Sequence, residues 1–174
     1  MAAITFLVGG ARSGKSTLAV DIGRRRRGDV VVIATAEPFD DDLRERIDRH
    51  RAERPGWPTV EAPLDLAGAV RGCPPDALVI VDCLTVWLGN ALHDGTIDPE
   101  AAVARLVDVL ARRPGPSVVV SNEVGLGIHP DNALARRYRD ALGRVNQAVA
   151  TAASTSLLLV AGRATELRDP WELL

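Results

Sequence analysis

The chain has 174 residues, of which 47% are hydrophobic and 25% charged, and its formal net charge is -2 at pH 7. This length suits a single domain with a substantial core, so we expect residues 1–174 to form one catalytic domain. The near-neutral charge argues against a nucleic-acid-binding surface. No segment approaches the roughly 18 consecutive apolar residues of a membrane span, so we expect none.

The expected compartment is the cytoplasm. Cys73 and Cys83 have neither metal-ligand spacing nor the partners for a disulfide framework. The N-terminus enters a predicted strand at once, which leaves no room for a signal peptide. The single basic block, residues 24–27, follows the first predicted helix, where cations complement the helix dipole, and a solvated helix end explains it better than a nucleic-acid contact.

Apolar runs and helical periods alternate along the chain. We predict strands at residues 4–8, 29–34, 77–81, 117–120 and 157–160, with a short edge strand at 59–61. Helices are predicted at residues 16–22, 40–54, 64–70, 101–112 and 133–151. Strands that are apolar throughout, without alternation, are buried on both faces, as in parallel sheets. The pattern predicts an α/β fold with a doubly wound, mostly parallel sheet and helices on both faces.

A phosphate-binding motif lies between the first strand and the first helix. It matches G-x-x-x-x-G-K-[ST] over Gly9, Gly10, Ala11, Arg12, Ser13, Gly14, Lys15 and Ser16. Lys15 is the only lysine among 21 basic residues. Its compact ammonium can reach the β- and γ-phosphates inside a ring of backbone amides, where a wide guanidinium fits poorly. The Ser16 hydroxyl is expected on Mg²⁺. The fold is therefore expected to be P-loop NTPase-like, of the RecA-like type.

Asp82 follows the third long apolar run. A carboxylate at the carboxyl end of a buried strand is what a Walker B element provides for Mg²⁺, directly or through water. The alternative is an aspartate that caps a turn. Because ligands of such sheets bind at the carboxyl ends of the strands, we favour the metal role.

The predicted helix at residues 40–54 places Arg46, His50 and Arg54 on one stripe. Neighbouring cations disfavour the imidazolium, so His50 could stay neutral and attack a phosphorus atom. The alternative is a solvated helix, because Asp42 and Arg46, among others, have the i,i+4 spacing of ion pairs. Spacing alone favours the solvated helix.

Residues 121–128 follow the fourth long strand and contain Asn122, Glu123 and two glycines. Asn122 and Glu123 could point into the same crevice as Asp82, although a plain connecting loop explains the segment equally well. His93 and His129 lie in loop-like contexts, so we expect no catalytic role for them.

Five motifs in this order resemble the bifunctional adenosylcobinamide kinase / adenosylcobinamide-phosphate guanylyltransferase family of cobalamin assembly. The resemblance extends from about Ile4 to Gly162. The motifs are Gly9–Ser16, Arg46–Arg51 with Arg54 and Pro55, Val81–Asn90, Ser121–Ile128, and Arg139–Gln147.

The resemblance implies two reactions. A nucleoside triphosphate, ATP or GTP, phosphorylates the aminopropanol hydroxyl of adenosylcobinamide. His50 then attacks the α-phosphorus of GTP and carries GMP covalently to the cobinamide phosphate, which gives adenosylcobinamide-GDP. The resemblance also implies a homotrimer.

The family's functional positions are similarly implied by the resemblance. His50 and Lys15 would be catalytic, and Ser16 and Asp82 would hold the metal. The nucleotide contacts would be residues 9–16, Ala34, Thr35, Ala36, Arg51, Ala52, Glu53, Arg54, Glu61 and Asp82.

Two other functions are compatible with the phosphate loop. A P-loop kinase for another small molecule would use Lys15, Ser16 and Asp82 but leave His50 idle. A nucleotide-switched binding protein would use hydrolysis only to gate a partner. GTP labelled at the α-phosphorus separates these possibilities, because only the guanylyltransferase retains acid-labile label on the protein.

Overall fold

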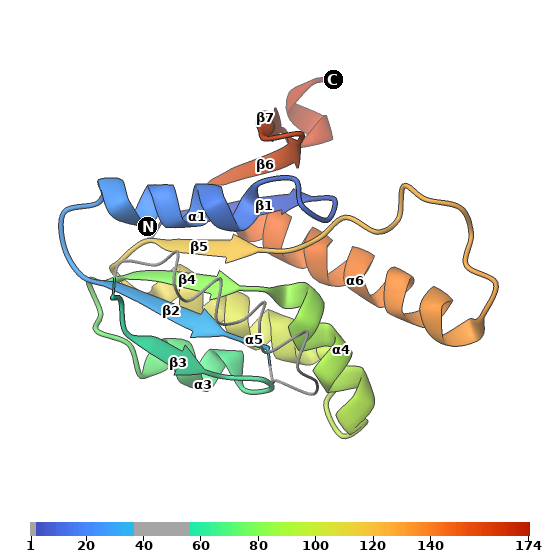
Figure 1. The fold of residues 1–174 in the computed structure, drawn as a ribbon, viewed down its shortest axis with the longest axis horizontal. Coiled ribbons are helices and arrows are strands. Elements are labelled where there is room, and N and C mark those ends of the chain that lie inside the picture. Colours follow the sequence, from blue (N-terminus) through green and yellow to red (C-terminus); the bar gives the residue numbers. More distant parts are fainter. Residues whose placement is uncertain (1–2, 37–55) are drawn as a thin grey trace.

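The structure is a computed structural model that describes residues 3–36 and 56–174 (Figure 1). Its centre is a seven-stranded sheet with the order β3-β2-β4-β5-β1-β6-β7. Every neighbouring pair is parallel except β6 and β7, which are antiparallel. The strands are β1 (Ile4–Gly9), β2 (Val30–Ala34), β3 (Thr59–Glu61), β4 (Leu78–Asp82), β5 (Ser117–Val120), β6 (Thr155–Val160) and β7 (Arg163–Leu167).

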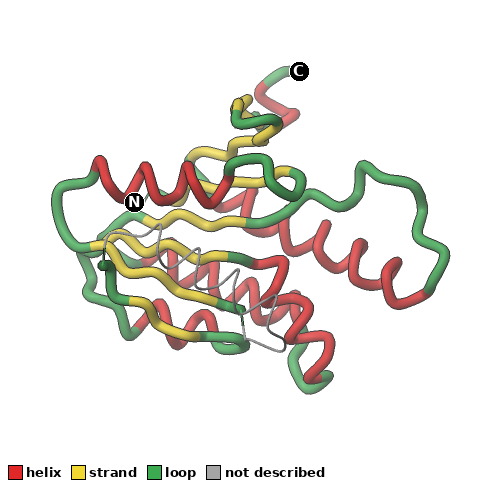
Figure 2. Tube along the Cα trace, in the orientation of Figure 1, coloured by secondary structure: helices red, strands yellow, loops and turns green. Residues whose placement is uncertain are grey.

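Helices cover both faces of this sheet (Figure 2). Helix α1 packs on one face, and the other described α-helices pack on the opposite face. The helices are α1 (Lys15–Arg25), α3 (Leu66–Arg71), α4 (Leu84–Asp94), α5 (Pro99–Arg112) and α6 (Ala133–Ala152), followed by a 3-10 turn at Pro170–Glu172. In the part of the chain that the structure describes, no helix is both long and apolar enough to cross a membrane.

Strands β1, β2, β4 and β5 are buried on both faces, as their continuous apolar runs predict. In β2, Val31 and Ile33 join the core cluster beneath α3–α6, whereas Val30 and Val32 join the cluster beneath α1. Successive strand residues point to opposite faces, so a strand covered on both sides must be apolar at every position. The predicted doubly wound, mostly parallel α/β fold is confirmed.

Helix α4 and strand β7 were not predicted, nor was the 3-10 turn at Pro170–Glu172. Helix α4 begins two residues after β4, and its core residues Leu84, Trp87, Leu88 and Ala91 recur at the i, i+3, i+4, i+7 spacing of a helix face, a signal from which the helix could have been predicted. It includes His93, and the expectation that His93 lies in a loop was therefore wrong. Strand β7 is exposed along its whole length, so it lacks an apolar run. The helix predicted at residues 40–54 lies outside the described residues.

Arg113 ties the starts of β4 and β5 together. Its guanidinium donates to four backbone oxygens at 2.9–3.0 Å and is almost completely buried, and this burial lowers its pKa. The acceptors are the carbonyls of Pro74, Ala77, Gly115 and Pro116. Ala77 and Gly115 are buried, so water cannot easily reach their carbonyl groups, and the guanidinium supplies the hydrogen-bond donors instead.

We expect Arg113→Leu to lower the free energy of unfolding by about 2–3 kcal/mol, because four backbone carbonyls, two of them on buried residues, lose a charged donor. The matched control is Arg112→Leu, whose exposed guanidinium pairs with Asp108 at 2.7 Å and should matter little. Urea unfolding of both variants measures the difference. Equal stability of the two variants would contradict the role given to Arg113.

Candidate functional site

The phosphate loop connects β1 directly to α1. Gly14 caps the helix in a left-handed conformation, with φ of 100°, and Lys15 is the first helical residue. Gly9 passes so close to the Leu159 carbonyl of β6 that a Cβ there would collide with it. The loop is therefore packed tightly against the sheet, and the amides at the start of α1 form an anion-binding site.

Lys15 is folded into this loop, with 6% of its surface exposed. Its Nζ donates to the Gly10 carbonyl at 2.6 Å and to Ser13 Oγ at 3.2 Å. Burial lowers the pKa of the Lys15 ammonium, and the nearby Asp82 carboxylate opposes this shift. An ammonium held by two neutral oxygens gains from exchanging them for phosphate oxygens, which carry negative charge.

Asp82 ends β4 opposite the loop, as expected. Ser16 Oγ donates to Asp82 Oδ1 at 3.4 Å, which brings together the two predicted metal ligands from sequence positions 66 residues apart. A hydroxyl and a carboxylate are hard oxygen ligands of the kind that Mg²⁺ takes together with phosphate oxygens. Across residues 3–36 and 56–174 there is no group of three or more His, Cys, Asp or Glu that could hold a metal by itself.

Thr35 joins the ends of β2 and β4. Its Oγ1 donates to the Cys83 carbonyl at 2.8 Å and accepts from the Cys83 amide at 3.0 Å. Asn90 Nδ2 in turn donates to the Thr35 carbonyl at 2.8 Å. Thr35 is fully buried, so its side chain holds the backbone beside Asp82 in place.

The other nucleotide contacts predicted near Thr35 lie at the same edge. Ala34 is the register partner of Asp82 on one side and of Glu61 on the other. Ala34 and Ala36 are half-buried, whereas Glu61 is exposed at the end of β3. In the loop, Ala11 and Arg12 are exposed, and Ser13 is buried.

The segment after β5 is attached to the phosphate loop. The Glu123 amide donates to the Gly9 carbonyl at 3.1 Å. Asn146 of α6, which the sequence did not single out as a site residue, accepts from Ser121 Oγ at 2.6 Å and donates to the Asn122 carbonyl at 3.0 Å. It thereby fixes the backbone that leads to Glu123. It lies within the Arg139–Gln147 motif, which contributed to the family resemblance without a role being assigned to this residue.

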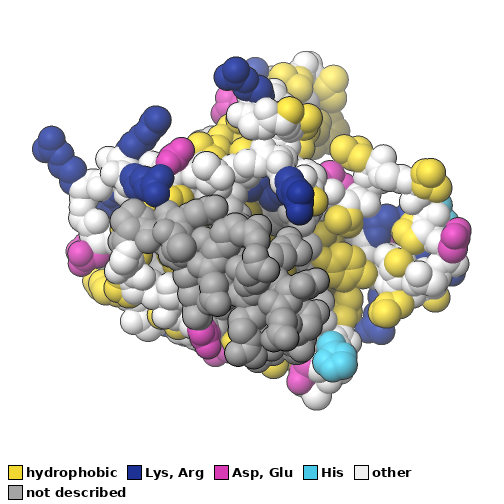
Figure 3. Space-filling model, in the orientation of Figure 1, with side chains coloured by type: hydrophobic (Ala, Val, Ile, Leu, Met, Phe, Trp, Pro, Cys, Tyr) yellow, Lys and Arg dark blue, Asp and Glu magenta, His cyan; other side chains and the backbone are white. Residues whose placement is uncertain are grey.

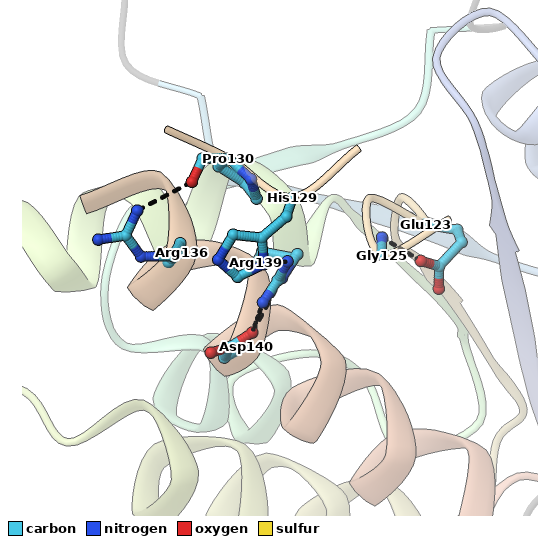
Figure 4. A network of polar contacts seen from close by, with 7 residues as sticks. All are labelled: Glu123, Gly125, His129, Pro130, Arg136, Arg139 and Asp140. Carbon is cyan, nitrogen blue, oxygen red and sulfur yellow. Dashed lines mark hydrogen bonds and ion pairs between the residues drawn. The ribbon is translucent and has the colours of Figure 1, made fainter. Parts of the chain in front are cut away.

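A polar network holds the rest of this segment on the start of α6 (Figure 4). Arg136 donates to the Pro130 carbonyl at 2.9 Å. Arg139 is paired with Asp140 and also lies 3.0 Å from His129 Nδ1, which must accept because a guanidinium can only donate. His129 therefore has a structural contact here.

Five predicted site residues lie outside the described residues. They are His50, Arg51, Ala52, Glu53 and Arg54. Their roles remain predictions from the family resemblance.

The sheet, the glycine-rich loop and the facing carboxylate define a P-loop nucleotide-binding protein. Solved structures share the fold. The assembled type III secretion ATPase EscN of enteropathogenic E. coli has a TM-score of 0.59 at 14% identity, over 92% of this chain and 43% of that one. A prototypical type III secretion ATPase has a TM-score of 0.55 at 15% identity, over 91% and 51%. This chain thus spans about half of their length.

The particular family follows from closer relatives. The family described as "Cobinamide kinase / cobinamide phosphate guanyltransferase" matches residues 5–167. The bifunctional adenosylcobalamin biosynthesis protein CobP of Pseudomonas aeruginosa is 41% identical, over 90% of this chain and 92% of its own. The corresponding protein CobU of Escherichia coli K12 is 37% identical, over 94% and 98%. The chain belongs to this family and is a bifunctional kinase and guanylyltransferase.

We expect Lys15→Ala to lower kcat of both reactions by roughly 100-fold or more, because the loop loses its one ammonium. Lys15→Arg should also be strongly impaired, since the planar guanidinium does not fit where Nζ contacts Gly10. Steady-state assays of each reaction, with circular dichroism to verify folding, test this. Near-normal turnover of the arginine variant would contradict the argument from the single lysine.

Proposed function

We propose that a single nucleotide site in this chain serves both transfers of its family. The observation that carries the proposal is the meeting of Lys15, Ser16 and Asp82 at one edge of the sheet. Lys15 and the loop amides would hold the β- and γ-phosphates in both reactions. What changes between the reactions is the phosphorus atom that is attacked.

In the kinase reaction, the aminopropanol hydroxyl of adenosylcobinamide attacks the γ-phosphorus. The bond from that phosphorus to the β–γ bridging oxygen breaks, the nucleoside diphosphate leaves, and the hydroxyl proton is lost. The leaving oxygen remains beside the Lys15 ammonium and the amides of the loop, which stabilise its developing charge. ATP and GTP both fit this role, because the loop contacts only phosphates.

In the second reaction, a nitrogen of His50 attacks the α-phosphorus of GTP. The bond to the α–β bridging oxygen breaks, and pyrophosphate leaves from the same loop. An oxygen of the cobinamide phosphate then attacks the phosphorus, the P–N bond breaks, and adenosylcobinamide-GDP forms. Covalent catalysis of this kind divides one difficult displacement into two easier ones.

We assign the metal to Ser16 and Asp82. Mg²⁺ bound there with phosphate oxygens would neutralise charge on the triphosphate. The 3.4 Å separation of Ser16 Oγ and Asp82 Oδ1 supports the assignment.

We further propose a cytoplasmic homotrimer whose partners are ATP or GTP and the corrinoid. The free Cys73 and Cys83 support the compartment, and sedimentation velocity tests the trimer.

Asp82→Asn should weaken magnesium-dependent turnover far more than folding, because the amide keeps the shape of the carboxylate but not its charge. Activity measured across a magnesium titration should move to higher metal concentration and fall at saturation. Asp108→Asn, an exposed carboxylate on α5, is the control. A wild-type titration curve for the Asp82 variant would identify it as a structural cap and make Glu123 the next candidate.

His50→Ala should lose the covalent GMP adduct and guanylyl transfer while retaining part of the kinase activity, since γ-phosphoryl transfer needs no protein nucleophile. Intact-mass spectrometry after incubation with GTP and Mg²⁺ measures the adduct. His93→Ala and His129→Ala provide the controls and should keep it. A GMP mass increment in His50→Ala would refute the nucleophile assignment.

A further inference from the structure

A cavity of about 520 Å³ lies between α4 and α6. This size falls in the range of small-molecule sites. The lining consists of Thr85, Val86, Gly89, Asn90, His93 and Tyr138. The segment after β5 and the start of α6 together form a projecting arm (Figure 1). Figure 3 shows hydrophobic side chains in the hollow at the base of this arm.

The cavity begins beside the phosphate site. Its α4 residues lie on one face of the helix, while Leu84, Trp87, Leu88 and Ala91 on the opposite face are buried in the core. Thr85 is three residues beyond Asp82, and its Oγ1 accepts from the Asn122 amide at 2.9 Å. From Thr85 to His93 the helix rises about 12 Å. The cavity thus runs outward from the edge where phosphate chemistry is expected.

Hydrogen bonds within the protein hold the walls of the cavity in place, so the cavity is formed before any molecule binds. Tyr138 OH donates to the Thr85 carbonyl at 2.9 Å, and burial raises the pKa of Tyr138 to about 12, so this donor stays protonated. Asn90 is anchored through Nδ2 to the carbonyls of Thr35 and Pro63. The result is a pre-formed, largely apolar cleft with a few polar groups, which suits an amphipathic ligand.

The position of the cavity favours the acceptor over the nucleotide. In-line phosphoryl transfer requires the attacking oxygen to approach from the side opposite the leaving group. Helix α1, whose N-terminal amides would hold the leaving phosphates, packs on one face of the sheet, whereas α4 and α6 pack on the other. A molecule lying between α4 and α6 therefore approaches the phosphates from the opposite side.

We infer that the cleft between α4 and α6 receives the aminopropanol arm of the corrinoid acceptor, which carries the reacting oxygen. The inference rests on the proposed function, because it names the place of that function's second substrate. The arm's amide and hydroxyl can meet the polar groups of Thr85 and Asn90, and its carbon atoms can lie on Val86, Gly89 and the ring of Tyr138.

Gly89 offers a direct test. A Cβ added at Gly89 meets no atom within 4 Å, and the same holds for Gly143 on α6, which does not line the cavity. Both glycines are half-buried and helical, so leucine at either position adds the same side chain without backbone strain. Gly89→Leu fills the cleft, and Gly143→Leu is the matched control.

Gly89→Leu should raise KM for adenosylcobinamide in the kinase assay by roughly tenfold or more, because extra carbon atoms in a binding pocket exclude its ligand. The GMP adduct formed with GTP alone, which needs no corrinoid, should be unchanged. Gly143→Leu should match the wild type in both assays. Gly89→Ala, which adds a single methyl group, should raise KM by less and carries the test if the leucine variant does not fold.

Two results would overturn the inference while leaving the proposed function intact. One is a normal adduct together with an unchanged KM for the corrinoid in Gly89→Leu. The other is an unchanged KM with altered sedimentation, which would make the cleft a contact between copies of the chain. Absence of the adduct from the wild-type protein would instead overturn the proposed function, and the inference with it.

Discussion

Parallel pairing of β5 with β1 on one side and with β4 on the other is the constraint on which the site depends. Val120 is the register partner of Leu7 and of Asp82 at once. Parallel strands in register finish at one edge, so the phosphate loop, the segment leading to Glu123 and the Asp82 carboxylate must emerge side by side. No local preference of these three segments would bring them together.

Rigidity at this edge comes from polar groups that are satisfied inside the protein. Thr35 and Cys83 exchange two hydrogen bonds, and Asn146 bridges Ser121 and Asn122. Leaving buried backbone groups without such partners would cost free energy, so the segments at the ends of these strands have few alternative conformations. The groups that would meet phosphate therefore sit on a fixed frame, which limits the reorganisation needed during transfer.

One small domain can catalyse both transfers if the part of the substrate that they share, the β- and γ-phosphates, is held in the same place. The β- and γ-phosphates can stay on Lys15 and the loop while different nucleophiles attack different phosphorus atoms. The two faces of the sheet then divide the substrates. In the arrangement proposed above, the triphosphate would lie at the N-terminus of α1, and the cleft between α4 and α6 would receive the reacting arm of the acceptor.

The sequence by itself determined the features that are local or compositional. The phosphate loop is one contiguous motif, and the apolar runs of β1, β2, β4 and β5 indicate strands that are covered on both faces. The order of five motifs was sufficient to identify the family, which the relatives confirm.

Only the tertiary structure decided which distant residues meet. The pairing of Ser16 with Asp82, the bridge made by Asn146 and the four carbonyls bound by Arg113 join segments far apart in the chain. Helix α4 carries a periodic signal at Leu84, Trp87, Leu88 and Ala91, but the cleft between α4 and α6 exists only once these two helices, far apart in the sequence, are packed side by side. Such contacts depend on packing between elements, which no local pattern encodes.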